Sequence, residues 1–115
     1  MSITHNQDGV FTVVSMNGRF DALGSRDFKN VISLLLDEQK KRIVLDMAHV
    51  DFIDSSGMGA LVGVLRTVEK EGGEIRIAGL IPEVHTIFEL TRLHRLFDIY
   101  ETAAAATLEI TNYEL

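Results

Sequence analysis

The strongest constraint on the fold is an alternation between stretches with helical spacing and short apolar runs of strand length. Residues 25–40 carry one apolar stripe at the i, i+3, i+4, i+7 spacing of a buried helix face: Phe28, Val31, Ile32 and Leu35. The apolar run 43–45 follows, and it is typical of a strand covered on both faces, as in a parallel sheet. Residues 57–71 then predict a second helix that ends at a glycine pair, and the alternating residues 74–78 predict another strand.

The segments on either side extend the same pattern. Residues 3–6 and 10–16 predict the two strands of a hairpin, because an Asp-Gly turn pair lies between them. Pro82 is well suited to the first turn of a third helix. Residues 97–100 predict a last short strand, and the alanines after Thr102 predict a short helix.

The fold class that follows is α/β, as a single domain over residues 1–115 with a small mixed sheet of about four strands and about four helices. Residues 46–54 are expected to form a loop beyond the carboxyl end of the central strand. Ligands and chemistry collect at that edge of such sheets. Residues 46–59 are therefore the expected place for a functional site.

The composition narrows the classes of function. The net charge is −6 and the only basic run, residues 40–42, suits a helix end, so no nucleic-acid partner is expected. No apolar run approaches the roughly 18 residues of a membrane span, and the first residues do not resemble a signal peptide. Cysteine is absent, which excludes disulfides and thiolate metal sites and agrees with a cytoplasmic location. The histidines show no metal-ligand spacing, at His5, His49, His85 and His94.

Residues 51–60 are the most unusual segment, because acidic residues, two hydroxyls and two glycines lie around the start of a predicted helix. On a purely structural interpretation, Asp54 or Ser55 caps the helix and the glycines let it pack on the sheet. This interpretation does not explain why the helix carries two apolar stripes. The first consists of Leu61, Val64 and Val68, and the second of Met58, Val62 and Leu65. One stripe serves the core, and the second, beside Gly59 and Gly63, is expected to be a partly exposed docking surface.

Catalytic functions find little support in this segment. The glycines at 57, 59 and 63 resemble a dinucleotide-binding fingerprint, but the last spacing is one residue too long and the chain is short for such a fold. The sequence has no Gly-x-Ser-x-Gly elbow for a serine nucleophile. Asp51 and Asp54 lack the complete loop of oxygen ligands that a hard cation requires. We therefore expect a protein that is not an enzyme and has no catalytic residue, metal or cofactor.

An ordered set of motifs resembles a known family along nearly the whole chain. Residues 54–59, Asp-Ser-Ser-Gly-Met-Gly, resemble the Asp-Ser-Ser/Thr-Gly-Leu-Gly signature of the anti-sigma factor antagonists, which are STAS domains. Four further matches, to the segment before the first helix, the central strand, the turn after the second helix and the third helix, lie at residues 18–21, 43–46, 72–75 and 82–88.

The resemblance implies a partner-switching regulator. In the family, the unphosphorylated domain binds an anti-sigma factor that is also a serine kinase, the kinase phosphorylates the first serine of the signature, and a serine phosphatase resets the domain. By this match Ser55 is the phosphoacceptor, and Asp21 is the acid near it that helps to contact the kinase. The expected partner-binding residues are Asp21, Asp54, Ser56, Gly57, Met58, Gly59, Val62 and Gly63.

Two residues depart from the family pattern. Met58 replaces the usual Leu, a change that nearly conserves volume, and Arg92 stands where the family often has Gly. The alternative function is a constitutive STAS subunit of a transport complex, or a small nucleotide-binding module, in which Ser55 is only a helix cap. STAS domains of transporters commonly lack this serine motif, so residues 54–57 favour the switch.

Overall fold

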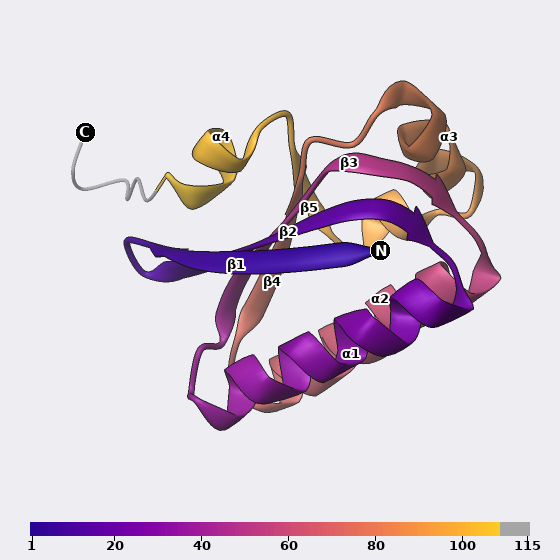
Figure 1. Ribbon diagram of the computed structural model, residues 1–115. Coiled ribbons are helices and arrows are strands. Elements are labelled where there is room, and N and C mark those ends of the chain that lie inside the picture. Colours follow the sequence, from indigo (N-terminus) through magenta and orange to yellow (C-terminus); the bar gives the residue numbers. More distant parts are fainter. Residues whose placement is uncertain (109–115) are drawn as a thin grey trace.

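A computed structural model of the chain describes residues 1–108, in which five strands form one mixed sheet in the order β1-β2-β3-β4-β5 (Figure 1). The strands are β1 (Ser2–Asp8), β2 (Phe11–Phe20), β3 (Arg42–Ile53), β4 (Glu74–Ala78) and β5 (Asp98–Tyr100). The helices are α1 (Ala22–Asp37), α2 (Ser55–Lys70), α3 (Pro82–Leu90) and α4 (Ala103–Thr107), with a short 3-10 helix η1 (Leu93–Arg95). The predicted α/β class is confirmed, with five strands where about four were expected.

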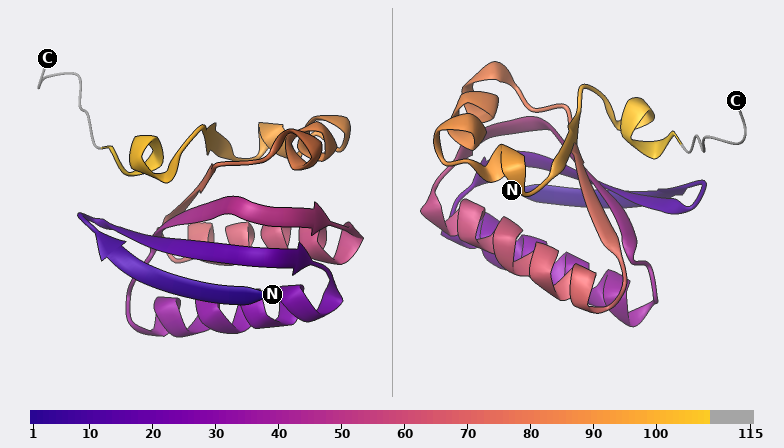
Figure 2. Two further views of the ribbon diagram at one scale, coloured as in Figure 1. Left: turned by 45° about the horizontal axis from the view of Figure 1, so that its top comes forward. Right: turned by 180° about the vertical axis from the view of Figure 1, so that it is seen from behind.

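The elements form three layers, with the sheet in the middle. Helices α1 and α2 lie side by side on one face, whereas α3 and α4 lie on the other side (Figures 1 and 2). Strands β1 and β2 form the predicted antiparallel hairpin, and β2, β3, β4 and β5 pair in parallel. Because β2 and β3 run in the same direction, the helices that follow them begin at the same edge of the sheet.

The prediction of a loop over residues 46–54 is wrong, because β3 continues to Ile53. The last buried side chains of this strand recur at every third residue, at Met47, Val50 and Ile53. The register between β2 and β3 shifts twice, at residues 15–17 and 18–19 of β2. Irregularities of this kind break the strand period of two, so a polar-rich sequence with this spacing does not resemble a strand.

Hydrophobic cores on both faces hold the sheet in place. The main core lies between the sheet and the helix pair and extends to Val84 and Phe88 of α3. It buries Phe20, Phe28 and Leu61 completely. The rings of Phe20 and Phe28 meet edge to face with their centres 5.2 Å apart. A smaller core on the other side includes Phe11 and Ala106 of α4. Packing on both faces thus fixes the strand ends from which α1 and α2 begin.

Candidate functional site

Two helix N-termini lie next to each other at the carboxyl edge of the sheet. Phe20 at the end of β2 pairs with Ile53 at the end of β3, and each strand is followed by an aspartate and then by a helix. Asp21 caps α1, because its Oδ1 accepts a hydrogen bond from the N–H of Gly24 at 3.1 Å. This cap explains why α1 begins before residue 25, the start that its apolar stripe predicts.

Asp54 caps α2 in the same way. Its Oδ1 accepts hydrogen bonds from the N–H of Ser56 at 2.9 Å and from the N–H of Gly57 at 3.1 Å. A carboxylate at this place also suits the positive end of the helix dipole. Of the two residues that the sequence offers as the cap, the structure selects Asp54 and leaves the Ser55 side chain without a capping role.

Ser55 is the first residue of α2, and its side chain is exposed. Among residues 1–108, no hydrogen bond joins its hydroxyl to another protein group. The hydroxyl of Ser25 in α1 differs, because it is buried and donates to the carbonyl oxygen of Asp21 at 2.7 Å. The Ser55 hydroxyl can therefore accept a transferred group without breaking a bond in the described fold.

The three glycines of α2 have different structural roles. A Cβ at Gly57 would overlap the carbonyl oxygen of Phe20 and lie 2.9 Å from Cγ1 of Ile53, so this glycine lets the first turn pack on the strand ends. Gly59 and Gly63 are exposed, and an added Cβ would meet no heavy atom within 4 Å. Each of these two costs the helix about 1 kcal/mol relative to alanine. Packing therefore accounts for Gly57 but not for Gly59 or Gly63.

The two apolar stripes of α2 differ in burial. The first stripe belongs to the core along its whole length, at Leu61, Val64 and Val68. Leu65 is also buried, so only Met58 and Val62 of the second stripe are partly accessible. Together with Gly59 and Gly63, these two residues form the α2 patch, which is apolar, small and close to Ser55 along the helix.

Asp21 adds a negative charge near the start of α2. The hydrogen bond from the N–H of Gly24 holds the pKa of its carboxyl below the usual value, and the nearby Arg19 acts in the same direction. The Nε of Arg19 lies 3.8 Å from Oδ2 of Asp21, and its guanidinium lies 3.8 Å from the centre of the Phe52 ring. Asp21 is therefore a fixed negative charge at neutral pH.

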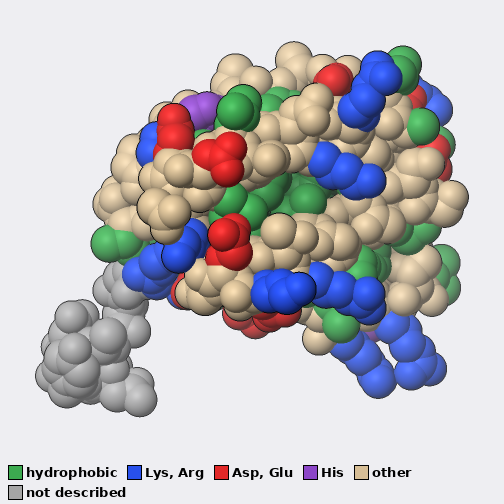
Figure 3. All heavy atoms as spheres, turned by 90° about the horizontal axis from the view of Figure 1, so that it is seen from below, with side chains coloured by type: hydrophobic (Ala, Val, Ile, Leu, Met, Phe, Trp, Pro, Cys, Tyr) green, Lys and Arg blue, Asp and Glu red, His purple; other side chains and the backbone are tan. Residues whose placement is uncertain are grey.

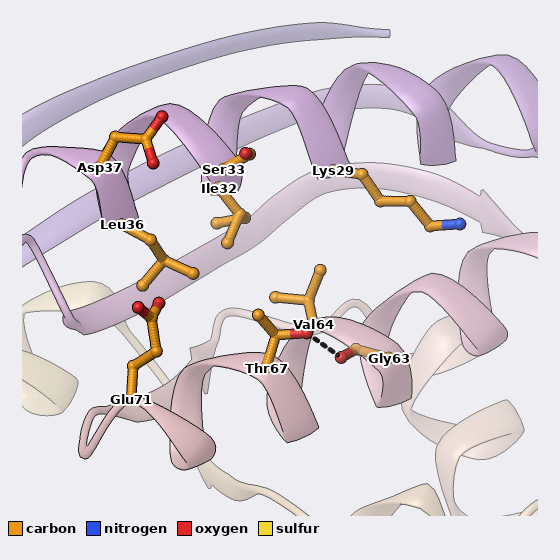
Figure 4. Close-up of a pocket in the computed structure, with 9 residues that line it drawn as sticks. All are labelled: Lys29, Ile32, Ser33, Leu36, Asp37, Gly63, Val64, Thr67 and Glu71. Carbon is orange, nitrogen blue, oxygen red and sulfur yellow. Dashed lines mark hydrogen bonds between the residues drawn. The ribbon is translucent and has the colours of Figure 1, made fainter.

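A hollow of about 420 Å³ lies between the first halves of α1 and α2. Ser55 and Ser56 line it from α2, and Arg26 and Lys29 line it from α1. A second hollow of about 460 Å³ follows along the later halves of the same helices and shares Lys29 (Figure 4). Figure 3 views the helix pair from outside and shows an apolar floor between charged side chains.

The two basic residues of this hollow, Arg26 and Lys29, are not among the site residues that the sequence predicts. Their spacing of three residues places Arg26 and Lys29 on one face of α1, a signal that is visible in the sequence. Only the packing of α1 beside α2 brings that face to Ser55. Asp21 and Asp54 cap the two helices that follow the paired strand ends, the α2 patch follows Ser55 along α2, and Gly57 is buried.

Within the part of the chain that the structure describes, no group of three or more His, Cys, Asp or Glu side chains could hold a metal ion. No helix in residues 1–108 combines the length and the apolar character needed to cross a membrane.

The STAS domain family model matches residues 2–106, and the chain therefore belongs to the STAS domain family. Its relatives include the anti-sigma F factor antagonist of Paenibacillus polymyxa, which is 27% identical over 103 residues that cover 85% of each chain. The crystal structure of TM1081 from Thermotoga maritima matches with a TM-score of 0.84, 24% identity and 90% coverage of each chain. The phosphorylated form of the Bacillus cell fate determinant SpoIIAA matches with a TM-score of 0.71 and 20% identity, over 91% of this chain and 96% of that one. At these identities the two structural matches establish the fold.

Proposed function

We propose that this chain is an anti-sigma factor antagonist that works by partner switching, with Ser55 as the phosphoacceptor. The unphosphorylated protein binds an anti-sigma factor that is also a serine kinase, phosphorylation of Ser55 releases this partner, and a serine phosphatase resets the switch. The observation that carries the proposal is the exposed Ser55 hydroxyl at the first position of α2, free of hydrogen bonds within residues 1–108. The names of the relatives support the same class of regulator.

The proposed partner-binding surface surrounds Ser55. Asp21, Asp54 and Ser56 supply polar contacts, and the α2 patch supplies apolar ones. Gly59 and Gly63 leave the backbone of α2 open to close approach, which gives a reason for two glycines that packing does not require. Gly57 contributes indirectly, because it brings the first turn of α2 onto the strand ends.

The protein is proposed to act in the cytoplasm as a binding partner, without a cofactor and without catalysis of its own. The alternative is a constitutive STAS subunit, or a nucleotide-binding module, in which Ser55 is never modified. The two functions differ in one measurable respect, which is whether a kinase places a phosphate on Ser55.

The test is co-expression with candidate anti-sigma factor kinases from the same genome, followed by intact mass measurement and phosphopeptide mapping. We expect one phosphate on the wild type and on Ser56→Ala, and none on Ser55→Ala. Loss of the phosphate in Ser56→Ala alone would move the phosphoacceptor to Ser56. An unmodified wild type with every such kinase would favour the constitutive subunit.

A further inference from the structure

We infer that the hollow beside Ser55 is a binding site for the chain's own phosphoserine, in which Arg26 and Lys29 of α1 hold the phosphate attached to α2. The inference rests on the proposed phosphorylation of Ser55, and it adds where the phosphate goes once it is attached. It also assigns a role to two cations that the proposed partner-binding surface does not include.

The geometry brings acceptor and cations to the same space. Ser55, Arg26 and Lys29 all line the hollow of about 420 Å³, which has room for a phosphate group. Asn30 lines it as well and carries an amide that can donate a hydrogen bond. The hollow is open to solvent at the exposed Ser55, so the phosphate does not have to enter a closed interior.

Arg26 and Lys29 combine two properties: they line the same hollow as Ser55, and they are not engaged in ion pairs. Several basic side chains are engaged in ion pairs with carboxylates, at Arg19, Lys40, Arg42 and Arg76. Within residues 1–108, neither Arg26 nor Lys29 has an ion pair or a side-chain hydrogen bond. Two exposed cations without a counter-ion therefore face the place where phosphorylation would add negative charge.

The negative groups nearby are already engaged. The Asp54 carboxylate accepts from the N–H of Ser56 and of Gly57, and the Asp21 carboxylate accepts from the N–H of Gly24 and lies near Arg19. These contacts leave Arg26 and Lys29 as the unpaired charges of the hollow, together with the positive end of the α2 dipole.

The chemistry of a phosphoserine fits these groups. It carries about −1.5 to −2 charges at neutral pH and three strong acceptor oxygens. An arginine binds such oxygens in a fork, and a lysine acts as a point charge. Held in this way, the phosphate would bridge α1 and α2 and fill the hollow that Gly59 also lines. The phosphate would then occupy the hollow beside the α2 patch and stand in the way of a partner seated there.

The experiment uses full-length protein with phosphoserine installed at position 55 during translation, so that no kinase is needed. Phosphorus NMR follows the pKa of the phosphate in the wild type, in the double variant Arg26→Ala/Lys29→Ala, and in the control Arg66→Ala/Lys70→Ala. The control removes two positive charges from exposed positions of α2 that do not line either hollow. The double variant should raise the phosphate pKa by about half a unit or more, while the control stays near the wild type.

A second readout is the change in melting temperature caused by the phosphate. The dipole of α2 acts on the phosphate in every variant. If the phosphate raises the melting temperature less in Arg26→Ala/Lys29→Ala than in the control, the difference is due to the two cations. The exchanged pair Arg26→Lys/Lys29→Arg keeps both positive charges, so its phosphate pKa should be as low as that of the wild type. Equal phosphate pKa values in the wild type and the double variant would overturn the inference. Failure of every kinase to modify Ser55 would instead overturn the proposed function and leave this result unaffected.

Discussion

At the scale of single residues, the aspartate before two adjacent exposed serines takes the capping role that a serine could otherwise have. Asp54 already satisfies the N–H groups of Ser56 and Gly57, which a serine at the cap would otherwise have to do. Ser55 is therefore not needed for the start of α2, and its hydroxyl is open to modification. The acidic cap therefore separates the stability of the helix start from the proposed phosphorylation of Ser55.

This separation predicts the effects of two substitutions. Ser55→Ala should change the free energy of unfolding by no more than about 0.5 kcal/mol, whereas Asp54→Ala should lower it by about 1 kcal/mol. Urea unfolding of both variants beside the wild type measures the difference. The Ser55→Ala protein should also keep its kinase bound in the presence of ATP. An equal loss of stability in the two variants would mean that the Ser55 hydroxyl caps the helix after all.

Arg92 is a second residue whose local geometry predicts a measurable effect. It ends the turn after α3 with a φ of 63°, in the left-handed region that glycine adopts without strain. Arg92→Gly should therefore raise the free energy of unfolding by about 0.5 to 1 kcal/mol. Gln39→Gly, at the other non-glycine residue with a φ of 63°, should do the same. Arg95→Gly, where φ is not positive, is the control and should show no gain.

At the scale of elements, α2 packs on the fold with one face and leaves another face open for the proposed partner. Gly57 faces the strand ends, whereas Gly59 and Gly63 face open space. Gly59→Ala and Gly63→Ala should each raise the free energy of unfolding by up to about 1 kcal/mol, because the helix gains propensity and the methyl group meets no neighbour. Both should weaken binding of the kinase, since the partner can no longer approach the backbone as closely.

The control for this prediction is Gly57→Ala, which should lower stability, because its methyl group would overlap the backbone of Phe20. Urea unfolding and a titration with the kinase are measured on all three variants. A Gly59→Ala or Gly63→Ala protein that gains stability and binds with full affinity would show that the glycines do not serve this partner.

Elements also differ in how well their sequence predicts them. The stripes of α1 and α2 predict both helices, because the helical spacing persists over several turns. The end of β3 could not be predicted, because its register shifts against β2 place buried residues at every third position. Within the site, the signature predicts the position of Ser55 at a helix start. Arg26, Lys29 and the buried Gly57 depend on how α1, α2 and β2 pack together, which local patterns do not contain.

At the scale of the whole molecule, the proposed phosphorylation site lies on a support that is packed on both sides. The sheet is packed on both faces, and α1 and α2 begin at neighbouring strand ends joined by the pairing of Phe20 with Ile53. A phosphate on Ser55 meets the positive end of α2 and, by our inference, Arg26 and Lys29. The folded protein should therefore tolerate the charge or gain stability from it, and the cost must fall on the complex.

Phosphorylation is accordingly predicted to release the partner locally, without refolding of the domain. A partner that fits a hydroxyl would remove water from a doubly charged group and offer no donor of its own in return, at a cost of about 3 kcal/mol or more. Because about 1.4 kcal/mol corresponds to a tenfold change in the dissociation constant, such a loss weakens binding by roughly a hundredfold or more.

The measurement compares backbone amide NMR spectra and kinase titrations of the plain and phosphorylated proteins, with Ser56→Ala as a matched background. Shifts should be confined to Asp21, residues 26–30 and residues 54–63, with affinity lost. Shifts across the distant strands β4 and β5, or unchanged affinity, would contradict a local mechanism.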